Sequence, residues 1–125
     1  MNILLDTHIA LRWFNDPSRL TPEARKAIAD PANNVLMSAI SVWEAEIKAA
    51  AGRLEMPVPL VESAREAGLE ELGVGWAHAR RAAGLPPFHR DPFDRMLVAQ
   101  AIEENLVIAT RDPLVRQYSA AVLPA

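Results

Sequence analysis

The sequence Ile3-Leu4-Leu5-Asp6-Thr7-His8 stands near the start of the chain and indicates how the rest is folded. Its apolar run is too short for a helix and is typical of a buried strand, which ends at Asp6. A helical stretch, 7–14, follows directly. Short apolar runs alternate with helical patterns along the whole chain, and the clearest later strand is 106–109, Leu-Val-Ile-Ala. The chain is therefore expected to be built from strand and helix units.

The other expected elements lie between turn signals. A threonine cap and a first-turn proline begin one helix, and glycines end two others. We expect strands at 35–37, 69–72 and 121–123, helices at 22–30, 38–51, 60–67, 76–83 and 91–104, a helical turn after Asp112-Pro113, and a proline-rich surface loop at 84–90. This alternation predicts right-handed βαβ units. The expected fold class is α/β, a single domain over residues 1–125 with a central parallel sheet of four to five strands flanked by helices.

Length and composition limit the function classes. The chain has 125 residues, of which 50% are hydrophobic and 23% charged, and this is typical of one compact domain. It has no cysteine, which excludes disulfides, iron–sulfur clusters and thiol nucleophiles, so a metal would need oxygen or imidazole ligands. The longest stretch without charge, 31–43, is too short for a membrane helix, and the N-terminus lacks a signal-peptide pattern. We expect a cytoplasmic protein with no membrane segment.

The charge balance gives a mixed indication about nucleic acid. The net charge of −3 disfavours broad, sequence-blind binding to nucleic acid, because such binding usually depends on a basic surface. Of the 13 basic residues, however, only Lys26 and Lys48 are lysines and the other 11 are arginines, whose planar guanidinium suits phosphate.

Four acidic residues stand where strands end or helices begin, and they are Asp6, Glu44, Asp94 and Asp112. Each has an ordinary explanation, because acids at helix starts cap free N–H groups. Ser41 to Glu44 fits a capping box, and Asp112-Pro113 fits a cap followed by proline. Strand ends of one parallel sheet face the same way, however, so these acids are expected at one edge.

Convergence of carboxylates has an energetic cost. Two of them about 4 Å apart repel by roughly 4 kcal/mol at an effective dielectric of 20, so a cluster needs protons or a cation. With only hard donors, Mg²⁺ or Mn²⁺ fits best. Asp91 and Asp94 are one helical turn apart and could reach the same ion. Asp91 is the expected helix cap, so Asp94 is the preferred ligand and Asp91 is expected just behind it.

Four ordered blocks resemble a known family. They are Ile3-Leu4-Leu5-Asp6-Thr7-His8, Ser38-Ala39-Ile40-Ser41-Val42-Trp43-Glu44, His89-Arg90-Asp91-Pro92-Phe93-Asp94-Arg95 followed by Ala99-Gln100-Ala101, and Ala109-Thr110-Arg111-Asp112. The chain resembles the PIN domain, specifically the VapC-type toxins of type II toxin–antitoxin pairs. The resemblance covers nearly the whole chain. Its acidic site corresponds to Asp6, Glu44, Asp94 and Asp112, and its usual hydroxyl after the first acid to Thr7.

The resemblance implies an endoribonuclease that depends on Mg²⁺ or Mn²⁺ and hydrolyses RNA by a metal-activated water. Asp6, Asp94 and Asp112 would hold the metal, Glu44 would bind metal or orient the water, and Thr7 and Asp91 would support the ligands from behind. The resemblance also implies a cognate antitoxin partner and a homodimer.

Two other function classes remain open from the residues. A phosphatase or phospho-acceptor also uses acids at this edge, but the Asp-x-Asp pattern is absent because His8 stands at the second position, and no lysine follows Lys48. A phosphate-binding P-loop motif is absent as well. The second alternative is a non-catalytic binding module in which the acids only cap helices. Mn²⁺ should raise the melting temperature of a metal site but not of a capping-only protein.

Other conspicuous side chains receive more ordinary interpretations. The three histidines are expected on the surface or packed, without a catalytic role, and the three arginines beside the acids could bind phosphate or pair with those acids. Trp43 shares a helix face with Ile40 and Ile47, which predicts a core or dimer-interface position. The histidines are His8, His78 and His89, and the arginines are Arg90, Arg95 and Arg111.

Overall fold

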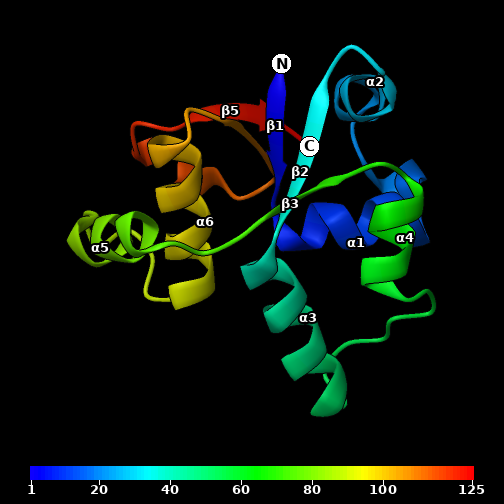
Figure 1. Cartoon of the computed structure of the whole chain (residues 1–125), viewed down its shortest axis with the longest axis horizontal. Coiled ribbons are helices and arrows are strands. Elements are labelled where there is room, and N and C mark those ends of the chain that lie inside the picture. Colours follow the sequence, from blue (N-terminus) through cyan, green and yellow to red (C-terminus); the bar gives the residue numbers. More distant parts are fainter.

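The computed structural model describes residues 1–125 as a five-stranded parallel sheet with the strand order β3-β2-β1-β4-β5 (Figure 1). Every neighbouring pair of strands is parallel. The α/β class and the central parallel sheet are therefore confirmed. The strands are β1 (Asn2–Leu5), β2 (Asn34–Ser38), β3 (Glu70–Leu72), β4 (Val107–Thr110) and β5 (Ala121–Pro124).

Helices cover both faces of this sheet. In Figure 1, α1, α2 and α4 lie on one side of the strands and α5 and α6 on the other. The predicted helices are confirmed to within one or two residues at each end, and the turn after Asp112 is a short 3₁₀ helix. The helices are α1 (Thr7–Asn15), α2 (Pro22–Ala29), α3 (Ala39–Ala50), α4 (Leu60–Glu66), α5 (Trp76–Gly84) and α6 (Pro92–Glu103), and the 3₁₀ helices are η1 (Pro17–Arg19) and η2 (Pro113–Gln117).

Strand β1 lies in the centre of the sheet. This position explains why its sequence is apolar without alternation. Ile3 and Leu5 pack into the core beneath α1, α2 and α4, whereas Leu4 points to the opposite core beneath α6. All three side chains are completely buried. Successive residues of a strand point to opposite faces, so a strand covered on both sides needs apolar residues throughout. Parallel pairing of β1 with β2 and β4 brings their carboxyl ends to one edge.

Local signals set the helix limits, with one exception. Gly52 and Gly68 follow α3 and α4 with φ of +70° and +77°, a left-handed conformation that glycine adopts without a Cβ clash. The predicted Ser41 to Glu44 capping box is wrong. Helix α3 begins three residues earlier, where the Ser38 hydroxyl accepts a hydrogen bond from the backbone N–H of Ile40. Ser41 therefore lies inside the helix.

The loop before α6 is held by Arg95. Its guanidinium donates to four backbone carbonyls, those of Ala82, Leu85, Pro86 and His89. Arg95 therefore neither pairs with an acid nor faces the solvent for phosphate, the two roles left open from the sequence. None of the helices is long and apolar enough to cross a bilayer.

Candidate active site in an acidic pocket

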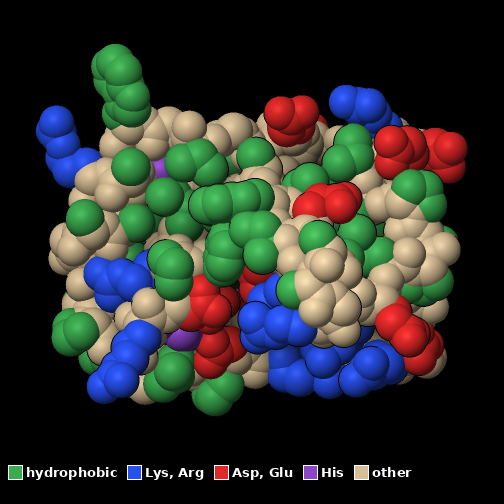
Figure 2. Space-filling view, turned by 90° about the horizontal axis from the view of Figure 1, so that it is seen from below, with side chains coloured by type: hydrophobic (Ala, Val, Ile, Leu, Met, Phe, Trp, Pro, Cys, Tyr) green, Lys and Arg blue, Asp and Glu red, His purple; other side chains and the backbone are tan.

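A pocket of about 320 Å³ opens at the carboxyl edge of the sheet. Figure 2 shows acidic side chains gathered on this face, with basic side chains on either side of them. All five acids singled out from the sequence line this pocket, so the structure brings them together. The lining residues are Asp6, His8, Ile9, Arg12, Glu44, Lys48, Asp91, Asp94, Arg111 and Asp112.

Asp6 lies at the junction of β1 and α1. Its side chain does not cap α1 and is only 8% exposed. Oδ2 accepts a hydrogen bond from Thr110 Oγ1 at 2.7 Å, whereas Oδ1 is buried without any partner. Burial raises the pKa of Asp6, and the charge of Glu44 raises it further. A buried carboxylate oxygen without a partner is costly, and a cation at this position would satisfy it.

Thr110 connects two of the acids and is a site residue that the sequence did not single out. It ends β4, and its buried hydroxyl donates to Asp6 Oδ2 and accepts from the backbone N–H of Asp112 at 3.1 Å. One hydroxyl thereby fixes the Asp6 carboxylate relative to the backbone that carries Asp112. A hydroxyl residue at the end of a strand, two positions before an acid, was the available signal.

Asp94 and Asp91 differ in their contacts, and the helix cap predicted at Asp91 is confirmed. Asp91 Oδ1 caps α6 by accepting from the backbone N–H of Phe93 at 2.8 Å. Asp94 lies in the first turn of α6, lines the pocket, and accepts no hydrogen bond. Burial raises the pKa of Asp94 to about 7, and the charges of Asp91, Asp6 and Glu44 contribute to this rise. Burial and the neighbouring acids therefore disfavour an ionised Asp94 in this pocket.

Asp112 is held on both of its carboxylate oxygens. Oδ1 accepts from the backbone N–H of Leu114 at 2.9 Å and caps η2, as predicted. Oδ2 lies 2.6 Å from His89 Nε2. One ligand atom from each of His89, Asp94 and Asp112 lies within 4.8 Å of the others, a spacing that could hold a metal ion. His89 is buried, as a packed histidine should be, but its contact with Asp112 was not predicted.

Glu44 projects into the pocket from α3. It is 3% exposed, and its Oε2 accepts from Lys48 Nζ at 2.5 Å, one turn along the helix. Lys48 therefore compensates the charge of Glu44.

The Thr7 hydroxyl takes a different direction from the one expected. It donates to Ser41 Oγ at 2.9 Å, ties α1 to α3, and does not line the pocket.

Arginines form another wall of the pocket. Arg12 and Arg111 line it. The pKa of Arg12 is lowered mainly by burial and further by the positive charges of Arg111 and Arg19. Arg111 donates to the backbone oxygens of Arg19 and Ala125. None of these three guanidinium groups is paired with an Asp or Glu side chain. Arg90 is exposed and makes no ion pair. Of the three arginines considered from the sequence, only Arg111 therefore reaches the pocket.

The donors fit a hard divalent cation. They are carboxylate oxygens, one of them without a partner on Asp6, and the chain has no cysteine thiolate to offer. The group of potential metal ligands whose atoms lie within 4.8 Å of one another consists of His89, Asp94 and Asp112. It contains two of the three predicted metal ligands and does not include Asp6. Asp6 lines the same pocket.

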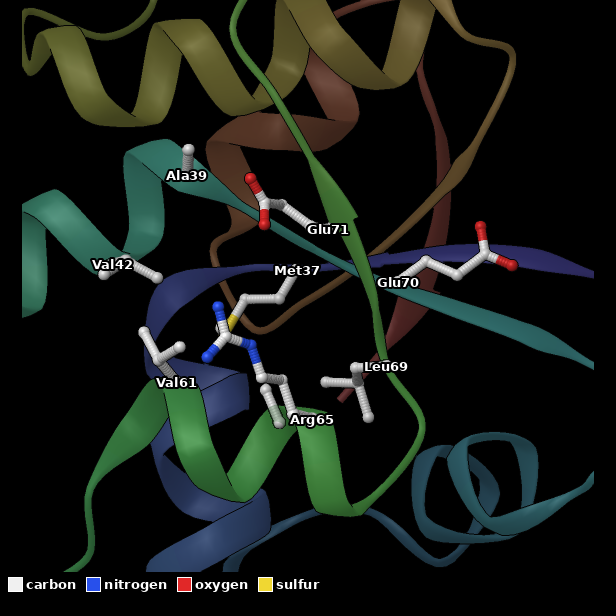
Figure 3. Close-up of a pocket in the computed structure, with 9 residues that line it drawn as sticks. Met37, Ala39, Val42, Val61, Arg65, Leu69, Glu70 and Glu71 are labelled. Carbon is white, nitrogen blue, oxygen red and sulfur yellow. The ribbon is translucent and has the colours of Figure 1, made fainter.

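A second hollow, of about 280 Å³, lies between α3, α4 and the edge strand β3. Figure 3 shows that its walls are mainly apolar, with Arg65 reaching across from α4 and Glu71 pointing toward Ala39. Glu70 and Glu71 are exposed. This hollow contains no group of potential metal ligands, so the chemistry is assigned to the acidic pocket.

Comparison with known proteins gives concordant results. Ribonuclease VapC22 of Mycobacterium tuberculosis is 31% identical over 119 residues, covering 93% of this chain and 91% of that protein. Crystal structures of VapBC2 from Rickettsia felis bound to a promoter DNA fragment and of VapBC-1 from nontypeable Haemophilus influenzae have the same fold. The first has a TM-score of 0.68 at 15% identity, and the match covers 98% of this chain and 98% of that chain. The second has a TM-score of 0.60 at 20% identity, and the match covers 98% of this chain and 97% of that chain.

The family model described as the PIN domain matches residues 3–120, a range that begins in β1 and includes every acid of the pocket. A parallel sheet with acids gathered at its carboxyl edge agrees with that match. The chain belongs to the PIN domain family.

Proposed function

We propose that this protein is a VapC-type toxin, an endoribonuclease that hydrolyses RNA phosphodiester bonds with the help of Mg²⁺ or Mn²⁺. The observation that carries the proposal is the unpartnered Oδ1 of Asp6 in the same pocket as an Asp94 whose pKa is raised to about 7. Such a pocket needs positive charge, and a phosphodiester can enter it only when that charge is present. The similarity to Ribonuclease VapC22 supports RNA as the substrate.

The residues divide the work as follows. Asp6, Asp94 and Asp112 would hold the metal, and Asp91 and Thr110 would fix the positions of these carboxylates from behind. Bound there, Mg²⁺ or Mn²⁺ supplies neutralisation of the phosphate charge and activation of the attacking water. Glu44 would orient that water, because Lys48 already compensates its charge and occupies Oε2.

The capping-only alternative accounts for part of the pocket. Asp91 and Asp112 do cap helices. Asp6 makes no capping hydrogen bond, Asp94 accepts none, and Glu44 bonds to a lysine side chain. Three of five carboxylates are therefore buried or partly buried in the pocket without a capping role, which favours a metal site.

Partners follow from the relatives. Two of the similar solved structures are VapBC structures, which supports an antitoxin as the protein partner of this chain. We also propose a homodimer. Trp43 is 59% and Ile47 42% exposed on α3, so Trp43 lies outside the core, and an apolar helix face of this kind is suited to an interface.

The test is cleavage of total RNA and purified tRNA by the full chain with Mg²⁺, with Mn²⁺, and with EDTA. We expect cleavage only with metal, and loss of cleavage in Asp6→Asn and Asp94→Asn. Glu46→Gln is the matched control, because Glu46 is an exposed acid on α3 outside the pocket. Metal-dependent cleavage that survives both Asp substitutions would contradict the assignment of these residues.

A further inference from the structure

His89 and Tyr118 form a buried aromatic pair behind the acidic pocket. His89 precedes α6 and is 7% exposed, and Tyr118 follows η2 and is also 7% exposed. Their rings are stacked, with centroids 5.5 Å apart and an interplanar angle of 8°. The histidine ring reaches Asp112 with one nitrogen and Tyr118 with the other. Through His89, Asp112 at the pocket is therefore linked to the buried Tyr118.

The hydrogen-bond partners determine which ring nitrogen of His89 carries the hydrogen toward Asp112. The Tyr118 hydroxyl oxygen accepts from the backbone N–H of His89 at 3.0 Å. Its own hydrogen is then free to point to Nδ1, which lies 2.9 Å away. A neutral ring whose Nδ1 accepts that hydrogen bond carries its own hydrogen on Nε2. Nε2 faces Asp112 Oδ2 at 2.6 Å, and an ionised carboxylate oxygen can only accept.

We infer that His89 is a positioning residue that holds Asp112 through its Nε2–H, and that it is not itself a metal ligand. The spacing of His89, Asp94 and Asp112, all within 4.8 Å, would by itself suggest that the imidazole joins the ligands. A ring nitrogen that carries a hydrogen has no lone pair for a metal, and Tyr118 keeps that hydrogen on Nε2. The inference rests on the proposed metal site.

This arrangement fixes the Asp112 carboxylate before a metal binds. The backbone N–H of Leu114 holds Oδ1 and His89 holds Oδ2, so rotation of the carboxylate would break both hydrogen bonds. Each oxygen keeps a further lone pair, which remains available on the side of the pocket. Residues that orient metal ligands in this way commonly change metal affinity by about 10- to 100-fold when they are removed.

The first experiment measures Mn²⁺ affinity by calorimetry on the metal-free full chain, with no RNA present. We expect His89→Ala to weaken Mn²⁺ binding by about 10- to 100-fold. His89→Gln should stay within about threefold of the wild type, because its amide N–H can donate to Asp112 Oδ2 in place of Nε2–H. Equal losses in His89→Gln and His89→Ala, or no loss in His89→Ala, would overturn the inference. Thermal unfolding in EDTA shows which variants are folded.

A second experiment does not depend on any substitution being tolerated. Nitrogen-15 NMR of the metal-free wild type reports which ring nitrogen of each histidine carries a hydrogen, and the tyrosine contact predicts Nε2–H for His89. After addition of Mg²⁺, which is diamagnetic, this signature should persist. A change to a hydrogen-free Nε2 on Mg²⁺ addition would make His89 a ligand and refute the inference.

In Tyr118→Phe the Nδ1 partner is lost, and an unchanged Mn²⁺ affinity together with an unchanged tautomer would refute the role of Tyr118.

Failure of the proposed function can be recognised separately. A wild-type chain that binds Mn²⁺ but leaves RNA intact would contradict the nuclease proposal and leave the role of His89 to be decided by the affinities. A wild-type chain that cleaves RNA with an affinity unaltered by His89→Ala would contradict only the positioning role.

Discussion

Replacing Asp94 by asparagine should make the metal-free protein more stable at pH 8. The pKa of Asp94 is raised from 3.8 to about 7, so the folded state holds the proton more tightly than the unfolded state. The contribution of this group to folding stability is therefore largest below the unfolded pKa and is lost as the pH rises toward 7. At pH 8 the folded protein carries an ionised, partly buried Asp94 among other carboxylates, and asparagine removes both the cost of burying that charge and the repulsion from its neighbours.

The size of the effect follows from the shift. A change of pKa from 3.8 to about 7 corresponds to at most about 4 kcal/mol. Asp94 is only partly buried, and screening by solvent reduces this to about 1–2 kcal/mol. For a domain of this length, a gain of that size raises the melting temperature by roughly 3–10 °C. At pH 5 less than half of the gain should remain, because the folded Asp94 is then already protonated.

The assay is thermal and urea unfolding of the wild type and Asp94→Asn in EDTA, at pH 5 and pH 8. Glu46→Gln is the control, because it removes one negative charge from the exposed side of α3. It should change the stability by less than about 0.5 kcal/mol at either pH. If Asp94→Asn were no more stable than the wild type at pH 8, or equally stabilised at both pH values, an ionised Asp94 held in a partly buried, acidic position would not be a cost to the fold.

Three further predictions concern the metal, the threonine bridge and the interface. Mn²⁺ at about 100 times its dissociation constant should stabilise the wild type by about 2.7 kcal/mol in thermal unfolding, and no shift would exclude a metal site. Thr110→Val, which leaves Asp6 Oδ2 and the Asp112 N–H without their shared partner, should cost about 1–3 kcal/mol in urea unfolding, while Thr110→Ser should retain most of the stability. Joint replacement of Trp43 and Ile47 by alanine should give a monomer in light scattering if α3 forms the dimer interface, and an unchanged dimer would place that interface elsewhere.

The sheet and its helices were accessible from the sequence because each depends on local signals and a repeated pattern. The uninterrupted apolar run of β1 indicates burial on both faces, and alternation with helices requires parallel strands. The meeting of Asp6 and Asp112 follows from that topology alone, because Asp6 directly follows β1 and Asp112 comes two residues after the end of β4, the neighbouring parallel strand. The position of the acids was therefore predictable without any knowledge of side-chain packing.

Side-chain directions were less accessible, because they depend on contacts between distant segments. Thr7 turns to Ser41 rather than to the acids, and Ser41 itself lies inside α3 because the helix begins at Ala39. The roles of Thr110 and His89 are hydrogen bonds formed only after β1, β4 and the loop before α6 have packed together. Sequence spacing does not contain that information.

The guanidinium of Arg95 fastens the loop before α6 to the helix that also carries Asp94. It spans four carbonyls with two nitrogens, which the three donors of a lysine ammonium at a single point could not reach. His89 stands at the far end of the same loop, with its own carbonyl among the four. The position of the imidazole relative to the acids thus depends on an arginine outside the pocket. A substitution at position 95 would disturb the acidic centre although it replaces none of the side chains there.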